Sequence, residues 1–297
     1  MNPNNLVSIN MRNGGRDMSG LLEQNPNPKK VQNTPKAPKS KFRVSRVAGV
    51  LILTIAVASV GKYGLDVYRE NLANKKEEAN INALMKKQQE EDAARKERVA
   101  NSKVAYLTFD DGPNYNTEKI LDILKENDIK ATFFLVGSMV ENNPGIVKRI
   151  QDEGHILANH TYSHKYAYKT KEEFLEEVEK TDELISKALG EEFKSYFVRV
   201  PGGSMGKKIA QEAIKENGYK SINWTGMFGD DEKGGKVDSK YIINRVKETT
   251  GDDQYEVVLA HGTKSVTVAT LQDIIDNLKA DGYIFEPLMK DSPVEFN

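Results

Sequence analysis

Histidine is scarce in this chain, and three of its four histidines lie close together in the sequence. His160 and His164 are four residues apart, so one helical turn would place both imidazoles on the same face, a common arrangement for binding a divalent metal. His155 precedes an expected strand and is interpreted as structural. His261 stands apart, near the C-terminus.

Two adjacent carboxylates, Asp110 and Asp111, follow a short apolar segment and precede Gly112 and Pro113, which turn the chain. Neighbouring carboxylates are costly to keep ionised without a cation. Either one could complete a set of two histidines and one carboxylate. The alternative interpretation is a turn whose aspartates cap a helix.

Two later segments carry groups that suit hydrolysis. Arg199 heads the run Arg-Val-Pro-Gly-Gly, and an arginine at a strand end can pair with a carboxylate and keep it ionised. The glycines after it, Gly202 and Gly203, leave backbone N–H groups open to an oxyanion. His261 ends the run Leu-Ala-His and could act as a general acid.

These residues fall at or near the ends of expected strands, in a segment where strands alternate with amphipathic helices. The expected strands are Val104–Phe109, Ala131–Val136, Phe197–Val200, Tyr219–Trp224, Glu256–Ala260 and Tyr283–Pro287. The expected helices are Thr117–Asn127, Val140–Glu153, Lys171–Leu189, Lys207–Asn217, Lys240–Thr249 and Val268–Ala280. Such alternation predicts parallel pairing and a barrel-like α/β fold, with chemistry at the C-terminal ends of the strands.

The overall composition excludes several classes of function. The chain has 297 residues and a net charge of -1, so its total charge gives no indication of nucleic-acid binding. Cysteine is absent, which excludes disulfides, a thiolate nucleophile and thiolate-bound zinc.

The segment before residue 103 predicts a membrane tether. Residues 1–46 are rich in Asn, Pro and Lys, with nine basic and two acidic side chains, and are expected to be a disordered, basic, cytoplasmic segment. Residues 47–65 are expected to form a single transmembrane helix, with the basic side in the cytoplasm and the remainder outside the cell. Residues 66–102 are expected to form a charged helical stalk, and residues 103–297 the α/β domain.

Two alternatives to the anchor remain. Ala56-Val57-Ala58 is similar to a signal-peptidase site, and cleavage after Ala58 would release a secreted form. A buried core helix is the other alternative, although the flanking segments offer no core to bury it. The sequence does not indicate the oligomeric state.

Residues 103–297 resemble the polysaccharide deacetylase domain, also called the NodB-homology domain, of carbohydrate esterase family 4. Thr108–Pro113 is similar to its TFDDGP motif and His160–His164 to its H[ST]xxH motif. Arg199–Gly203 resembles its arginine-proline-glycine motif, and Leu259–His261 its Leu-x-His motif. The motifs occur in the family's order. The resemblance implies a distorted (β/α) barrel and hydrolysis of N-acetyl groups on a glycan.

The resemblance also implies roles for the matching residues. Asp111, His160 and His164 would bind the divalent metal, with zinc expected and cobalt, nickel or manganese as alternatives. Asp110 would be the general base, and Arg199 would orient and tune it.

The remaining roles concern the acetyl group and the leaving amine. His261 would protonate the leaving nitrogen, the N–H of Gly202 would hold the oxyanion, and Leu259 would pack against the acetyl methyl. A tethered member would act on a cell-wall glycan within reach of the membrane, with peptidoglycan preferred. Whether N-acetylglucosamine or N-acetylmuramic acid reacts is left open.

The chain departs from the family's fourth motif, which reads W-x-x-D-x-x-D-W. Trp224 and a later aspartate are kept, whereas Met227 replaces the first Asp and Asp231 the closing Trp. Asp230 is then the candidate that tunes the acid. The missing Trp leaves one wall of the acetyl pocket to either Trp224 or Phe228.

Three competing functions fit parts of the sequence. Gly202–Gly206 matches the G-x-S-x-G pattern of serine hydrolases, with Ser204 as nucleophile and Asp230 or Asp231 and His261 as partners. A glycan-binding or scaffolding domain without turnover is the second, and a related enzyme acting on an ester or a small amide is the third.

Overall fold

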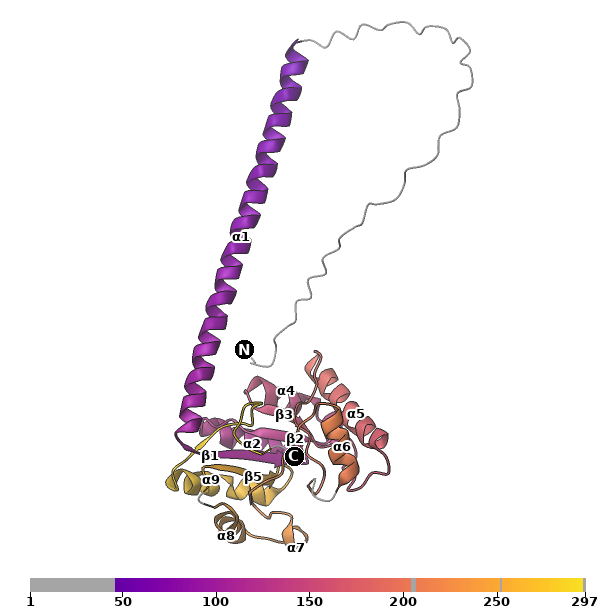
Figure 1. Ribbon diagram of the computed structural model, residues 1–297, viewed down its shortest axis with the longest axis vertical. Coiled ribbons are helices and arrows are strands. Elements are labelled where there is room, and N and C mark those ends of the chain that lie inside the picture. Colours follow the sequence, from indigo (N-terminus) through magenta and orange to yellow (C-terminus); the bar gives the residue numbers. More distant parts are fainter. Residues whose placement is uncertain (1–45, 204–206, 252, 296–297) are drawn as a thin grey trace, which may run out of the picture. The chain divides into compact units, whose positions relative to one another are not determined.

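The computed structural model describes residues 46–203, 207–251 and 253–295. The described chain forms two compact units, residues 46–94 and residues 95–295. The first unit is part of one continuous helix, α1 (Arg46–Ala100), whose last residues belong to the second unit (Figure 1).

α1 contains both the predicted anchor and the predicted stalk. The side chains of residues 46–61 lie outside the described part, as do residues 1–45 altogether. Among the residues that are described, no helix combines the length and apolar character needed to cross a membrane. The anchor over residues 47–65 and the basic segment over residues 1–46 therefore stay predictions.

The last turns of α1 are part of the α/β domain. Arg95 binds Asp291 with 2.6 Å between nitrogen and oxygen, and Arg98 pairs with Glu286. Val99 is buried among the core side chains. The compact domain thus begins at about residue 95, earlier than the predicted start at residue 103.

The domain is built on a parallel sheet with the strand order β3-β2-β1-β5-β4, and β6 pairs with β1 off this path. The strands are β1 (Lys103–Asp110), β2 (Thr132–Leu135), β3 (Ile156–Asn159), β4 (Gly226–Met227), β5 (Tyr255–His261) and β6 (Tyr283–Phe285). This is the predicted α/β class, with every described ladder parallel.

β1 is the central strand, and both of its edges are paired. β5 runs beside it in register from Val104 opposite Tyr255 to Asp110 opposite His261. On the other edge, β6 pairs with the beginning of β1 and β2 pairs with its end. The register brings Asp110 and His261 side by side at the C-terminal end of the sheet.

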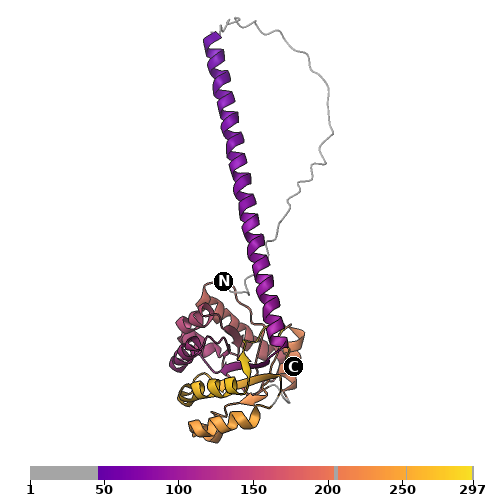
Figure 2. The ribbon, with the colours of Figure 1, turned by 90° about the vertical axis from the view of Figure 1, so that its left-hand side faces the viewer.

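Helices follow the strands along the chain. They are α2 (Tyr115–Glu126), α3 (Gly137–Asn142), α4 (Pro144–Asp152), α5 (Lys171–Leu189), α6 (Lys208–Glu216), α7 (Glu232–Gly235), α8 (Ser239–Thr249) and α9 (Ser265–Ala280). α5 packs against α6, and α8 packs against α9 (Figures 1 and 2).

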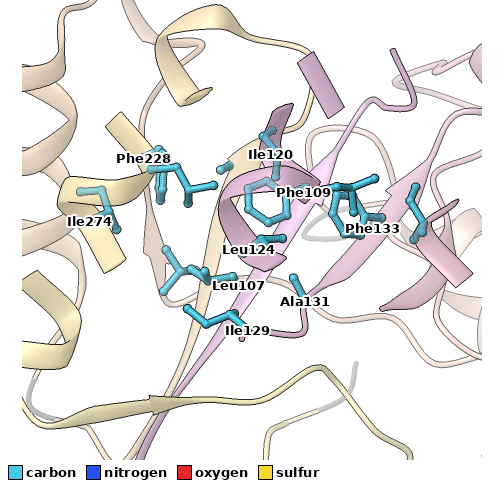
Figure 3. Packing of buried hydrophobic residues seen from close by; sticks show 14 of the residues in the cluster. Leu107, Phe109, Ile120, Leu124, Ile129, Ala131, Phe133, Phe228 and Ile274 are labelled. Carbon is cyan, nitrogen blue, oxygen red and sulfur yellow. The ribbon is translucent and has the colours of Figure 1, made fainter. Parts of the chain in front are cut away.

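Alternate residues of β1 point into two separate cores. Leu107 and Phe109 pack with α2 and α9, and the rings of Phe109 and Phe133 stack with centroids 5.1 Å apart (Figure 3). Val104 and Tyr106 point to the opposite face, into a second cluster. Thr108 and Asp110 continue that second face towards the C-terminal end of the strand, because side chains alternate along a strand.

Three predicted elements differ from the structure. The helix expected over Val140–Glu153 is split into α3 and α4, because Pro144 lacks an N–H and restricts Asn143, which leaves the helical conformation. The strands expected over Phe197–Val200 and Tyr219–Trp224 form only single bridges, Asn159 to Val198 and Phe197 to Lys220.

The second of these segments also reaches β5. The N–H of Thr225 donates to the carbonyl of Val257, and Gly226 pairs with β5 in β4. Residues 220–227 therefore pair at one end with the segment that follows β3 in the sheet and at the other end with β5. The stretch between these two pairings is irregular. The carbonyl of Ile222 in that stretch accepts a hydrogen bond from Arg199 instead of from a neighbouring strand. This arrangement is consistent with the distorted barrel that the resemblance implied.

Candidate active site

The predicted site residues gather at the C-terminal ends of the strands. Asp110 is the last residue of β1, His261 the last of β5, and His160 directly follows β3. Parallel strands end at one edge of a sheet, so residues distant in sequence meet there.

Asp111, His160 and His164 form a compact ligand set, with their candidate ligand atoms within 4.8 Å of one another. Oδ1 of Asp111 lies 3.1 Å from Nε2 of His164 and 3.6 Å from Nε2 of His160. The centroids of the two imidazole rings are 4.9 Å apart. His160 is buried, whereas Asp111 and His164 are partly exposed, which leaves an open side for substrate and water.

The tautomer of His160 suits metal binding. Its Nδ1 lies 2.8 Å from the carbonyl oxygen of Arg199, which can only accept, so Nδ1 carries the proton. Nε2 is then unprotonated, and it faces Asp111. Burial lowers the pKa of His160, although Asp110 and Asp111 oppose that effect, and this favours the neutral ring that a metal requires.

Asp111 has the charge and the geometry of a ligand. Burial raises the pKa of its carboxyl, but the close contact with His164 and the nearby imidazoles of His261 and His160 outweigh burial and lower it to about 2. Oδ1 is buried without a hydrogen bond of good geometry. An ionised, buried and unsatisfied carboxylate oxygen facing two imidazole nitrogens fits a divalent cation, so these residues suit the metal that the sequence predicted.

A second carboxylate–histidine cluster does not fit a metal. Asp230, Asp231 and His261 also lie close together. However, Asp230 accepts hydrogen bonds from the N–H and from Nδ1 of His261, and from the hydroxyl of Thr267. Its oxygens are therefore already satisfied by the protein.

Arg199 binds the carboxylate of Asp110. Its guanidinium is fully buried and donates through Nη1 to Oδ1 of Asp110 at 2.8 Å and to the hydroxyl of Thr108 at 2.8 Å. Oδ2 of Asp110 is directed elsewhere, 3.6 Å from Nε2 of His160. One oxygen is thus fixed by the arginine while the other faces the metal ligands, which suits a base that takes a proton from water at that point.

Asp230 controls the protonation of His261. Burial lowers the pKa of His261, but its hydrogen bond to Asp230 at 2.7 Å and the charges of Asp230, Asp110 and Asp111 outweigh burial and raise it to about 9. His261 is therefore protonated at neutral pH. Because Nδ1 is engaged by Asp230, Nε2 is the atom left to donate a proton.

α5 holds the loop that carries both histidines. The side-chain amide of Asn159 donates to Asp182 and to the carbonyl of Val178, and its oxygen accepts the N–H of Thr161. Glu177 accepts hydrogen bonds from the N–H and the hydroxyl of Ser163. These contacts were not predicted from the sequence, because no local pattern pairs this loop with that helix.

Thr108 was also missed, although a signal for it exists. It stands two residues before Asp110 on a strand, so alternation places both side chains on one face. Its hydroxyl donates to the carbonyl of Val258 on β5 and accepts from Arg199, so it connects the guanidinium to β5.

The residues expected around the acetyl group are placed as follows. Leu259 lies two residues before His261 on β5, on the same face. Gly202 is exposed with φ 70°, a conformation that favours glycine. Trp224 is partly buried beside Gly203, and its ring centroid lies 5.8 Å from the guanidinium carbon of Arg199.

The structure distinguishes the two candidates for the acetyl-pocket wall. Phe228 is fully buried with Ile274 of α9 (Figure 3). This cluster also contains Leu107 and Phe109, so it packs on the face of β1 opposite Thr108 and Asp110. Trp224 packs against the second core cluster, and its ring lies near Arg199. Of the two candidates, Trp224 is therefore the one that lies near the site. Ser204, the nucleophile of the serine-hydrolase alternative, lies outside the described residues.

The wider comparison with known proteins agrees with this geometry. A family model described as polysaccharide deacetylase matches residues 97–222. A peptidoglycan-N-acetylglucosamine deacetylase from Bacillus cereus is 31% identical over 259 residues, which cover 83% of this chain and 94% of that protein. The chain belongs to the polysaccharide deacetylase family.

Other family members support the same relationship. A peptidoglycan-N-acetylmuramic acid deacetylase from Bacillus subtilis is 31% identical over 188 residues, 63% of this chain and 70% of that protein. The crystal structure of a polysaccharide deacetylase from Bacillus cereus aligns with a TM-score of 0.59 and 34% identity, covering 66% of this chain and 96% of that one. Related polysaccharide deacetylases thus carry names for two different sugars.

The assigned roles of Asp110 and His160 predict different losses. Asp110→Asn should keep the metal and reduce turnover by about 10²- to 10⁴-fold, the range typical of a lost general base. His160→Ala should lose both metal and turnover, because it removes a ligand. Metal analysis and acetate release are measured on both variants, with circular dichroism to verify folding. If Asp110→Asn emptied the site, these assignments would be wrong.

The contact between Asp230 and His261 predicts a shifted pH profile. The carboxylate holds the pKa of His261 near 9, so the acid form persists up to that pH. Asp230→Asn should lower that pKa and move the alkaline limb of kcat/KM to lower pH. Asp231→Asn is the matched control, because Asp231 is exposed with its oxygen 4.0 Å from Nε2, and should shift the limb less. An unchanged limb in Asp230→Asn would contradict the role of His261.

Proposed function

We propose that this chain hydrolyses N-acetyl groups on a cell-wall glycan, with peptidoglycan as the substrate, and releases acetate. The observation that carries the proposal is the convergence of three groups at the C-terminal ends of β1, β3 and β5. They are a carboxylate fixed by Arg199, a metal-ligand set with an open side, and a protonated imidazole on the neighbouring strand.

Asp110 acts first in the proposed mechanism. It takes a proton from a water molecule through Oδ2, while Arg199 holds Oδ1 in place. The water oxygen forms a bond to the acetyl carbon, and negative charge gathers on the carbonyl oxygen. Asp111, His160 and His164 would hold a divalent cation, which would supply polarisation of that carbonyl and a more acidic water. In this proposal the N–H of Gly202 donates to the same oxygen.

His261 completes the reaction. An amide nitrogen leaves poorly as an anion, so it requires a proton as the C–N bond breaks. His261 is charged at neutral pH and gives the proton from Nε2, while Asp230 stabilises the ring through Nδ1. The products are acetate and the free amine of the sugar. Leu259, on the same strand face, is the proposed contact for the acetyl methyl.

Peptidoglycan is favoured over other glycans by two observations. The two relatives described above are named for N-acetylglucosamine and for N-acetylmuramic acid deacetylation of peptidoglycan. The apolar run over residues 47–65 would keep the domain beside a wall polymer. Since relatives of similar identity are named for different sugars, the proposal stays at the level of the polymer.

The central test is release of acetate from purified peptidoglycan by the full chain. We expect release that a chelator abolishes and that added zinc or cobalt restores. Chelator-resistant release would instead favour the serine-hydrolase alternative with Ser204. Rapid cleavage of aryl acetates without any acetate from the glycan would refute a glycan substrate.

We further propose that residues 47–65 anchor the chain, with the domain outside the cell. The support is the apolar run and the excess of basic residues before it. Protease added to intact cells should remove the domain and leave a short membrane-bound fragment that contains residues 1–46. A mature protein that begins after Ala58 would show cleavage and a secreted form instead.

A further inference from the structure

Two large hydrophobic side chains of the α/β domain are strongly exposed within the described residues from 103 onward. They are Tyr115, which is 67% exposed, and Tyr166, which is 63% exposed. Tyr166 stands two residues after the metal-ligand candidate His164, and the two rings meet edge to face with centroids 5.2 Å apart. The exposed ring of Tyr166 thus contacts a candidate metal ligand that is itself partly exposed.

Gly202 leaves space for the Tyr166 ring. A Cβ atom at Gly202 would lie 3.0 Å from Cδ1 and 3.1 Å from Cε1 of Tyr166, so any other residue would displace the ring. Nζ of Lys207 lies 5.5 Å from the ring centroid. Tyr166 is therefore positioned by its neighbours and joins a metal ligand to the proposed oxyanion donor, while most of its surface faces solvent.

The charges around the ring are already engaged by the protein. Lys165 binds Glu177 with 3.1 Å between nitrogen and oxygen, and Lys207 donates to the carbonyl of Pro201. This wall of the site therefore offers an aromatic face rather than a free cation. Such a surface suits a neutral ligand with an apolar face and a polar rim, because an aromatic ring with a hydroxyl combines these two properties.

We propose that Tyr166 is a sugar-stacking residue that sets the preference of this site for a pyranose ring over a small acetylated compound. This inference rests on the proposed deacetylase function. The acetyl group reacts between Asp110 and His261, and the C–H face of the sugar lies on Tyr166 next to His164. Tyr166 is a specificity-determining residue here and takes no part in proton transfer.

The test compares a glycan with a small substrate. The full chain and its variants Tyr166→Ala and Tyr166→Phe are assayed with soluble peptidoglycan fragments and with 4-nitrophenyl acetate. Tyr166→Ala should raise KM for the glycan by about 5- to 30-fold, the range for truncating an aromatic contact, with kcat little changed. Tyr166→Phe should keep a KM near that of the native chain, because the ring is retained. 4-Nitrophenyl acetate should be cleaved equally by all three.

Tyr115→Ala is the matched control. Tyr115 is equally exposed, but its ring contacts Lys119 and none of the site residues described above. An equal rise in KM in this variant would overturn the assignment to Tyr166. Loss of metal from Tyr166→Ala, or slower cleavage of 4-nitrophenyl acetate, would show that Tyr166 only supports His164, and would overturn it as well.

The proposed function and the stacking role of Tyr166 can be refuted independently of each other. If the native chain released no acetate from peptidoglycan, the proposed function would fail. If the native chain were active and Tyr166→Ala had an unchanged KM for the glycan, the stacking role alone would fail.

Discussion

The site depends on one buried cation, the guanidinium of Arg199. A fully buried charge is tolerated only when it is paired and hydrogen-bonded, and here the partners come from separate segments. The side chain binds Asp110 and Thr108 on β1 and the carbonyl of Ile222. The backbone carbonyl of the same residue accepts a hydrogen bond from Nδ1 of His160. Arg199 thus fixes the orientation of one carboxylate and the tautomer of one imidazole at once.

The two connections that carry the candidate metal ligands, after β1 and after β3, contain unfavourable backbone conformations that the rest of the domain must stabilise. Asp111, Thr161 and His164 all have positive φ, which costs a residue other than glycine about 1–3 kcal/mol. The opposing contributions come from α5, which buries Phe174, Val178 and Ile185 and binds the loop through Asn159 and Ser163. The packing of that helix therefore maintains the ligand geometry.

Much of this arrangement could be predicted from the sequence, because the chemical groups lie in short motifs at strand ends. Alternating strands and helices require those ends to meet, so the ligand set and the pair Asp110 and His261 were expected together. The irregular stretch around Ile222 was not predicted, because a side chain, Arg199, replaces the neighbouring strand as its hydrogen-bond partner. The contacts of Glu177 and Asp182 were missed because they connect segments through tertiary packing alone.

The register between β1 and β5 has a consequence for how this fold can be altered. Asp110 and His261 are direct partners on adjacent strands, so their spacing follows from the distance between strands in any sheet, about 4.8 Å. Tyr166 and Gly202, in contrast, belong to connections outside the strands. The proposed proton transfer therefore depends on strand ends, whereas the proposed choice of ligand depends on the connections between strands. A protein engineer could redesign the connections for a new acetylated compound while leaving the acid–base geometry untouched.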